Sequence, residues 1–172
     1  MALIDIIKKR FSVRDFKEKP VEEEILRQIL EAAKWAPSAC NNQPCVCIIV
    51  RDRAKKQRLR PAYNRDWFVN APVIIAVCID KQSAWRRMDG VSYGYVDAAI
   101  FMDHMILAAT ELGLGSCWIG AFKVPEAKKA LSLPDHIDPV LLCPLGYSKQ
   151  EIPKRKRKEI SEIVCWEHFG GK

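Results

Sequence analysis

The feature that most constrains this fold is a long, almost wholly apolar helical segment at residues 92–112. Asp97, His104 and Glu111 recur in it every seven residues, and apolar side chains fill nearly every other position. A helix with so narrow a polar stripe must be buried on more than one side. A small domain rarely covers a helix so completely by itself, which predicts that part of the segment faces a second subunit. We therefore expect a homodimer.

Short apolar runs and one amphipathic stripe predict the other elements. Residues 45–50 and 73–80 are rich in Val and Ile, which predicts buried strands. Residues 21–35 carry a single apolar stripe, which predicts a helix with one buried face. The remaining predicted elements are helices at 2–9 and 124–131, a basic helix between the first two strands, and strands at 116–119 and 139–145. Because no repeat or long linker divides the chain, we expect a single domain over residues 1–172 that ends in a polar and basic arm at 153–172.

Neither a membrane anchor nor a disulfide framework is expected. Acidic residues interrupt the longest apolar segment, so it is too short to span a bilayer, and the N-terminal sequence MALIDIIKKR lacks the small-residue cleavage site of a secretory signal. We expect a cytoplasmic protein. The seven cysteines are an odd number and most lie in apolar surroundings, which favours reduced thiols. The cluster Cys40, Cys45 and Cys47 contains no C-x-x-C pair, so we expect no metal site.

The positive charge of the chain is concentrated in two segments. The formal net charge of the chain is +7. Residues 51–67 and 153–172 together carry a larger net positive charge than this, so the rest of the chain is slightly negative. Local basic patches suit the phosphate groups of a cofactor or nucleotide, but for residues 51–60 a solvated face is the favoured interpretation. The same patches could attract nucleic acid. No base-reading motif accompanies them, so a nucleic-acid-binding module is the less favoured alternative.

The segment Arg10-Phe11-Ser12-Val13-Arg14 alternates cationic or hydroxyl side chains with apolar ones. In an extended loop the polar side chains of Arg10, Ser12 and Arg14 would therefore point the same way. Two guanidinium groups can each donate bidentate hydrogen bonds to phosphate oxygens, and a hydroxyl between them adds a neutral donor. On spacing alone, an equal alternative is that both arginines pair with acidic neighbours on the surface.

Further motifs favour phosphate binding over surface ion pairing for this segment. R-x-S-x-R at 10–14 is followed by A-P-S-x-x-N-x-Q-P at 36–44, a rigid loop that holds polar side chains between two prolines. G-L-G-S-C-W-I-G stands at 113–120 and P-L-G-Y at 144–147. Together these motifs resemble the flavin-dependent nitroreductase family over essentially the whole chain. The resemblance implies an α+β fold, with a central, mostly antiparallel or mixed sheet flanked by helices. It also implies an interlocked homodimer with flavin mononucleotide (FMN) at each of two interface sites built from both chains.

The resemblance also assigns site residues, all of them for cofactor binding. Arg10, Ser12 and Arg14 would hold the phosphate and ribityl end of FMN. The residues expected to edge the isoalloxazine ring are Pro37, Ser38, Ala39 and Asn41. Those expected near flavin N5, where a missing side chain permits close approach, are Gly120 and Ala121. A second basic pair on the phosphate would be Arg155 and Arg157, or in a shifted register Lys156 and Lys158.

Two positions depart from the family pattern. Glu159 stands where many relatives have proline, and Cys45 where an aromatic residue is frequent. Both weaken the match locally. Ser38 could also serve only to turn its loop.

The implied function is NADH- or NADPH-driven, two-electron reduction of nitroaromatics, quinones or similar electron-poor acceptors by a ping-pong mechanism. Flavin N5 would carry the hydride, so no catalytic side chain is expected, and the three histidines fit structural or solvated roles. Reductive dehalogenation, flavin breakdown and dehydrogenation stay open as alternatives. No insertion is large enough to cap the site, so the sequence leaves the small-molecule acceptor undetermined.

Overall fold

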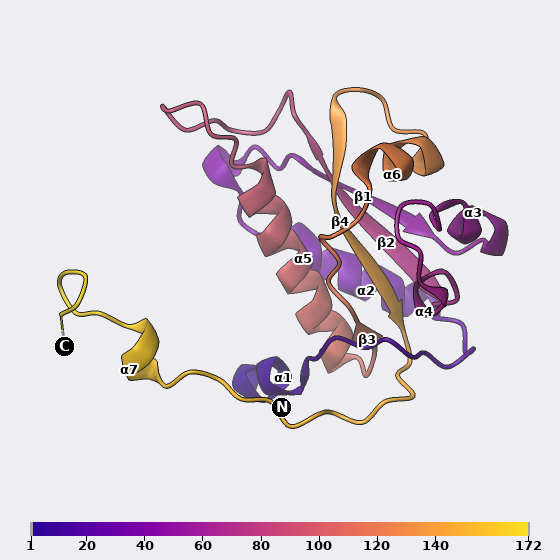
Figure 1. Cartoon of the computed structure of the whole chain (residues 1–172), viewed down its shortest axis with the longest axis horizontal. Helices are drawn as coiled ribbons and strands as arrows, with labels where there is room; N and C mark the ends of the chain where they lie inside the picture. Colours follow the sequence, from indigo (N-terminus) through magenta and orange to yellow (C-terminus); the bar gives the residue numbers. More distant parts are fainter. Residues whose placement is uncertain (1, 172) are drawn as a thin grey trace.

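The computed structural model describes residues 2–171 and contains one antiparallel sheet with helices on both faces (Figure 1). The helices are α1 (Leu3–Lys9), α2 (Glu23–Lys34), the 3₁₀ turn η1 (Ala39–Asn41), α3 (Arg53–Arg58), α4 (Asp66–Val69), α5 (Gly94–Glu111), α6 (Val124–Leu131) and α7 (Ile160–Ile163). The strands are β1 (Cys45–Val50), β2 (Val73–Asp80), β3 (Gly115–Ser116) and β4 (Ile137–Gly146). This arrangement confirms the predicted α+β fold class.

The sheet has the strand order β1-β2-β4-β3, and each neighbouring pair is antiparallel. Strand β2 lies in the middle, and its residues 73–79 are all buried. A bulge at Val140 shifts the register of β4 between Val77 and Cys78. Strands β1 and β3 stand at the two ends of this order. The outer side of β3 makes a single parallel bridge to Ser12, whereas the outer side of β1 has no strand partner among the described residues.

Alternate residues of β2 belong to two separate cores, because successive side chains of a strand point to opposite faces. Ile75 and Val77 pack with α2 and α5, through residues such as Ile29, Met102 and Met105. On the other face, residues of β2 and β4 pack with α3, α4 and α6; that core includes Leu59, Phe68, Ile74, Ala76, Cys78 and Leu142. The result is three layers with the sheet in the middle, as Figure 1 shows.

Two sequence predictions need correction. The strand predicted at 116–119 pairs regularly only at Gly115–Ser116, and Ile119 makes a single bridge to Leu142. Cys117 N–H still donates to the Pro144 carbonyl over 3.3 Å, but proline has no N–H to return and the ladder is interrupted.

The second correction concerns the solvated face predicted for residues 51–60. Lys56 is buried there, and its Nζ donates to the carbonyl oxygens of Ala71 and Pro72. Burial lowers the pKa of this amine. Lys56 therefore serves the fold and is not available to a surface partner.

The C-terminal arm extends away from the sheet, as Figure 1 shows in yellow. Nearly all of its residues are exposed, including Ile160, Ile163, Trp166 and Phe169. No helix among residues 2–171 is long and apolar enough to cross a membrane.

Gly115 allows the loop at residues 10–14 to lie against the sheet. A Cβ on this glycine would lie 2.5 Å from Val13 Cγ2, whose side chain is completely buried. We predict that Gly115→Ala lowers the free energy of unfolding by about 1–3 kcal/mol, as measured by urea denaturation. Gly120→Ala is the control, because the nearest atom to its added Cβ is 3.9 Å away. Equal destabilisation by both substitutions would contradict the packing argument.

Candidate functional site

The loop at residues 10–14 is extended and fixed to an edge of the sheet. Ser12 pairs in parallel with Ser116, and Val13 N–H donates to the Ser116 carbonyl over 2.9 Å. Val13 is buried and Arg14 is exposed. This alternation is the one expected from the sequence, and it leaves the polar side chains on the side opposite Val13.

The pKa of the Cys117 thiol depends on the side chains of this loop. Burial raises the pKa of the thiol, while the positive charge of Arg14, a hydrogen bond with Ser12 and the charge of Arg10 oppose the rise. The side chains of Arg10, Ser12 and Arg14 therefore all influence this one thiol. We refer to Arg10, Ser12 and Arg14 as the clamp.

The arm brings a second cationic pair to the clamp. The Arg155 guanidinium donates to the backbone carbonyls of Lys8 and Arg10. Partial burial, together with the nearby charges of Arg157 and Arg10, lowers the Arg155 pKa. Arg155 is therefore the arm residue whose side chain contacts the backbone at the start of the clamp.

The cations of this cluster have no carboxylate partners among residues 2–171. Arg10, Arg14, Arg155 and Arg157 form no salt bridge there, and Asp15 pairs with Lys149 over 3.7 Å instead. The surface ion-pair alternative for the clamp is therefore not seen in the described part of the chain. Guanidinium groups without counter-charges are typical of sites that bind multiply charged anions.

The loop at residues 37–43 is held rigidly at the other end of α5. Ala39 N–H donates to Asp97 Oδ1 over 3.0 Å, and Gln43 N–H donates to Ser38 Oγ over 2.9 Å. Cys40, Asn41 and Gln43 all have positive φ angles between 49° and 54°. Such backbone is costly for residues other than glycine and persists only where surrounding contacts impose it.

The side chains of this loop have distinct roles. The Ser38 hydroxyl turns the loop by accepting from Gln43 N–H. Asn41 is exposed, and its Oδ1 accepts from Gln43 Nε2 over 3.2 Å. The Asn41 amide nitrogen is thus at the surface, where it can donate to a ligand.

Two cavities border the loop and share Pro37, Ser38 and Asp97. One has a volume of about 350 Å³ and includes Cys45 and Phe101. The other, of about 310 Å³, lies between the loop and the aromatic pair Trp85 and Tyr93, whose rings meet edge to face with centroids 5.0 Å apart. Their largely apolar walls suit flat, uncharged rings.

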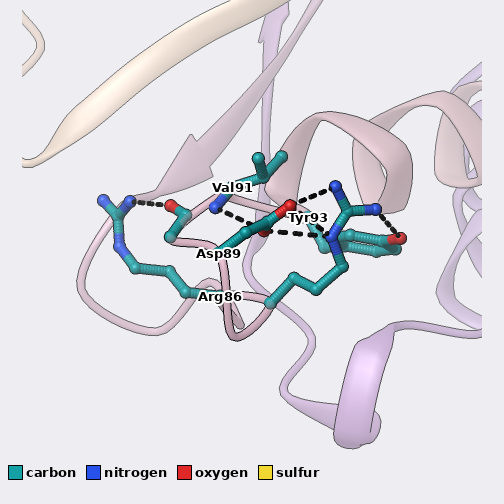
Figure 2. Close-up of polar contacts among 6 residues, drawn as sticks. Arg86, Asp89, Val91 and Tyr93 are labelled. Carbon is teal, nitrogen blue, oxygen red and sulfur yellow. Dashed lines mark hydrogen bonds and ion pairs between the residues drawn. The ribbon is translucent and has the colours of Figure 1, made fainter.

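The segment that carries this aromatic wall is braced by polar contacts, which Figure 2 shows. Arg87 forms an ion pair with Asp89 at 2.5 Å and donates to Tyr93 Oη over 3.2 Å. Arg86 donates to the Gly90 carbonyl over 3.0 Å. Sequence reasoning missed this wall. The segment AWRRMDGVSY signals it only weakly, by one aromatic residue near each end and charged residues between them.

Gly120 and Ala121 lie on the clamp side of the molecule. Both are exposed, and a Cβ added to Gly120 would lie no closer than 3.9 Å to its nearest neighbour, Leu141 Cδ2. Ala121 lines a shallow cavity of about 530 Å³ together with Asn64 and Arg65. Neither Asn64 nor Arg65 was predicted from the sequence. They offer an amide and a guanidinium beside the backbone expected near the flavin.

Aromatic contacts connect this cavity to the clamp. The Arg14 guanidinium lies 6.0 Å from the centroid of the Trp67 ring, and Trp67 meets Tyr63 edge to face at 5.8 Å. Tyr63 also lines the cavity beside Ala121. The clamp, Asn64 and Ala121 therefore form one continuous side of a site.

A single chain does not bring the clamp and the 37–43 loop together. The loop is fixed to the first turn of α5, whereas the clamp lies beside β3, just beyond the last turn; Figure 1 shows α1 and β3 at that end of α5. The 18 residues of α5 span about 27 Å. This distance exceeds the length of a mononucleotide.

No group of metal-ligating side chains was found among residues 2–171. The seven cysteines are all free, and Cys78, Cys117 and Cys143 are buried. His104 Nδ1 lies 3.1 Å from the Ile100 carbonyl within its own helix, and His136 and His168 are exposed. The polar groups that could hold a ligand are thus the clamp, the arm arginines, the 37–43 loop and the segment around Asn64.

Comparison with known proteins finds the same fold and family. The family described as "Putative TM nitroreductase" matches residues 2–169. A nitroreductase family protein of Clostridium difficile 630 has 34% sequence identity and a TM-score of 0.91, with 98% of this chain and 99% of that chain covered. An FMN-dependent nitroreductase of Clostridium difficile R20291 has 30% identity and a TM-score of 0.81, with coverage of 96% and 99%.

Among curated proteins, one from Methanothermobacter thermautotrophicus is 34% identical over 86% of this chain and 78% of its own length. It is named "Putative NADH dehydrogenase/NAD(P)H nitroreductase".

The contacts of Arg155 generate a prediction about the arm. Arg155→Ala leaves the carbonyls of Lys8 and Arg10 without their charged donor, so the last turn of α1 should open more readily. We expect amide hydrogen exchange at Lys9 and Arg10 to accelerate about fivefold. Lys158→Ala removes the same charge from an exposed arm residue and should leave these amides unchanged. Equal acceleration in both variants would show that charge alone, and not the contact, is responsible.

Proposed function

Because the chain belongs to the nitroreductase family, we propose that it is an FMN-dependent oxidoreductase that takes electrons from NADH or NADPH. The observation that carries this proposal is the cluster of guanidinium groups without carboxylate partners beside the clamp. A phosphate monoester carries the charge and the acceptor oxygens that such a cluster lacks.

The residues present fit FMN along its whole length. Arg10, Ser12 and Arg14 would hold the phosphate, with Arg155 and Arg157 beside them. When bound, the flavin supplies two-electron transfer between a nicotinamide and an acceptor.

The protein would bind and orient the ring. Gly120 leaves room for close approach to its N5 side, and Asn64, Arg65 and Ala121 lie where they could line its polar edge. Positive charge and backbone donors on that side favour the negative charge that builds up on reduction.

The separation of the clamp from the 37–43 loop supports a homodimer. Each site would take the clamp from one chain and Pro37, Ser38, Ala39 and Asn41 from its partner. The exposed apolar residues of the arm and of α5, among them Tyr95 and Val96, provide surface for such an assembly. The open edge of β1 provides unpaired backbone groups.

We further propose nitroaromatics, quinones or similar flat, electron-poor compounds as acceptors in a ping-pong reaction. Relatives named as nitroreductases support this substrate class. The apolar cavity walled by Trp85 and Tyr93 suits such rings.

The clamp generates a prediction for cofactor binding. Arg14 is exposed and forms no salt bridge among the described residues, so Arg14→Ala should weaken FMN binding about 10- to 100-fold while thermal unfolding of the apoprotein changes little. Arg27→Ala is the matched control, because Arg27 pairs with Glu23 on the exposed face of α2. Fluorescence titration with FMN measures both affinities. If Arg14→Ala instead unfolds the protein and the folded fraction binds FMN normally, Arg14 has a structural role.

A second prediction concerns the reaction. Under anaerobic conditions NADH or NADPH should bleach the absorbance of the bound flavin, and a nitroaromatic or quinone should restore it. Steady-state rates at several acceptor concentrations should give the parallel double-reciprocal lines of ping-pong kinetics. If neither coenzyme bleaches the flavin, the proposal that NADH or NADPH donates the electrons is wrong.

A further inference from the structure

Asp97 is a buried acidic residue that none of the predicted roles uses. It is only 3% exposed, on the first turn of α5. Its Oδ1 accepts from Ala39 N–H over 3.0 Å, whereas its Oδ2 is buried without a hydrogen-bond partner among residues 2–171. A buried polar atom left in this state costs free energy, so its retention calls for a reason.

Asp97 holds the loop segment that begins at Ala39. Ala39 directly precedes Cys40 and Asn41, whose φ angles are 52° and 54°. Each such residue costs free energy in isolation. The bond to Asp97 is the contact that ties the amide at the start of this strained segment to the helix. Without it the segment would retain Ser38–Gln43 and its own internal bonds, but not its connection to α5.

The negative charge of Asp97 also affects a residue outside the loop, Cys45. Burial raises the pKa of the Cys45 thiol to about 12, and the Asp97 carboxylate adds to the rise. No cation forms a salt bridge with Asp97 in the described part of the chain. The partial positive charge at the N-terminal end of α5 provides the compensation that a buried carboxylate needs.

We propose that Asp97 is a positioning residue for the flavin ring, acting through Ala39, and that its buried charge lowers the reduction potential of the bound flavin. This inference rests on the proposed function. The hydrogen bond fixes the loop that carries Pro37, Ser38 and Asn41 against the ring. The charge lies behind the same loop and disfavours the added electrons of reduced FMN.

Two substitutions separate the hydrogen bond from the charge. Asp97→Asn keeps an oxygen that accepts from Ala39 N–H and removes the charge. It also places its amide nitrogen where an oxygen already had no partner. Asp97→Leu keeps the branched shape and the number of side-chain heavy atoms, and it removes both the hydrogen bond and the charge. Asp135→Asn removes one charge from an exposed turn and serves as the control.

The first readout does not need the cofactor. In the apoprotein, amide hydrogen exchange at Ala39 should accelerate about tenfold in Asp97→Leu and stay near the wild-type rate in Asp97→Asn. Unchanged exchange in Asp97→Leu would overturn the role of the hydrogen bond. So would acceleration of the same size in Asp97→Asn.

The second readout uses the FMN-loaded protein. Affinity for oxidised FMN should fall about tenfold in Asp97→Leu and be retained in Asp97→Asn. In Asp97→Asn reduced FMN should gain affinity about tenfold over oxidised FMN, which raises the two-electron potential by about 30 mV. Asp135→Asn should change neither quantity.

The outcomes separate this inference from the proposed function. A potential in Asp97→Asn equal to that of wild type would overturn the electrostatic part. Wild-type protein that binds no FMN would refute the proposed function instead, and the exchange rates of the apoprotein would still decide whether Asp97 holds the loop.

Discussion

Helix α5 packs Ala98, Met102 and Met105 into the core that it shares with α2 and one face of the sheet. Because these side chains are fully buried, the helix has no freedom to slide or tilt against β2 without opening cavities. Both parts of the candidate site are attached to this rigid element. The 37–43 loop is attached to its first turn by Asp97, and the clamp lies against Gly115, just beyond its last turn. The length of α5 therefore fixes the separation of the two parts.

The two ends of α5 also differ in charge. At the clamp end, guanidinium groups from the N-terminal loop and from the arm gather with no carboxylate among their salt-bridge partners in the described residues. At the other end a single buried carboxylate lies behind a pair of largely apolar cavities. In the proposed dimer these unlike ends meet across the interface, so one flavin would experience positive charge at its phosphate and negative charge behind its ring. Binding and redox tuning would then come from different chains.

Much of this arrangement was accessible from the sequence because its signals are local. The alternation in residues 10–14 predicted an extended loop, and the buried Val13 confirms it. The apolar periodicity of residues 92–112 predicted α5 to within two residues at each end. Strand 116–119 was predicted too long, because the effect of Pro144 depends on which strand pairs with Cys117, and pairing is a long-range property.

Other features could not be read from the chain because they depend on tertiary contacts. The heptad spacing assigned Asp97 to a polar stripe with His104 and Glu111, yet only the position of Ala39 explains why it is buried. Asn64 and Arg65 stand in a basic, loop-like segment without a motif, and become candidates only through the cavity that they share with Ala121. The wall formed by Trp85 and Tyr93 likewise needs the return of the chain between Arg86 and Ser92.

The division of the site has a thermodynamic consequence. A ligand that contacts the clamp of one chain and the loop of another binds the dimer better than it binds either chain alone, so cofactor binding and assembly stabilise each other by the same free energy. The arm adds to this coupling, because Arg155 fixes its first part beside the clamp while its apolar residues beyond Ile160 stay exposed within the chain. In the proposed dimer, an arm that is anchored beside the clamp and covered by the partner chain would make cofactor binding and assembly a single cooperative process.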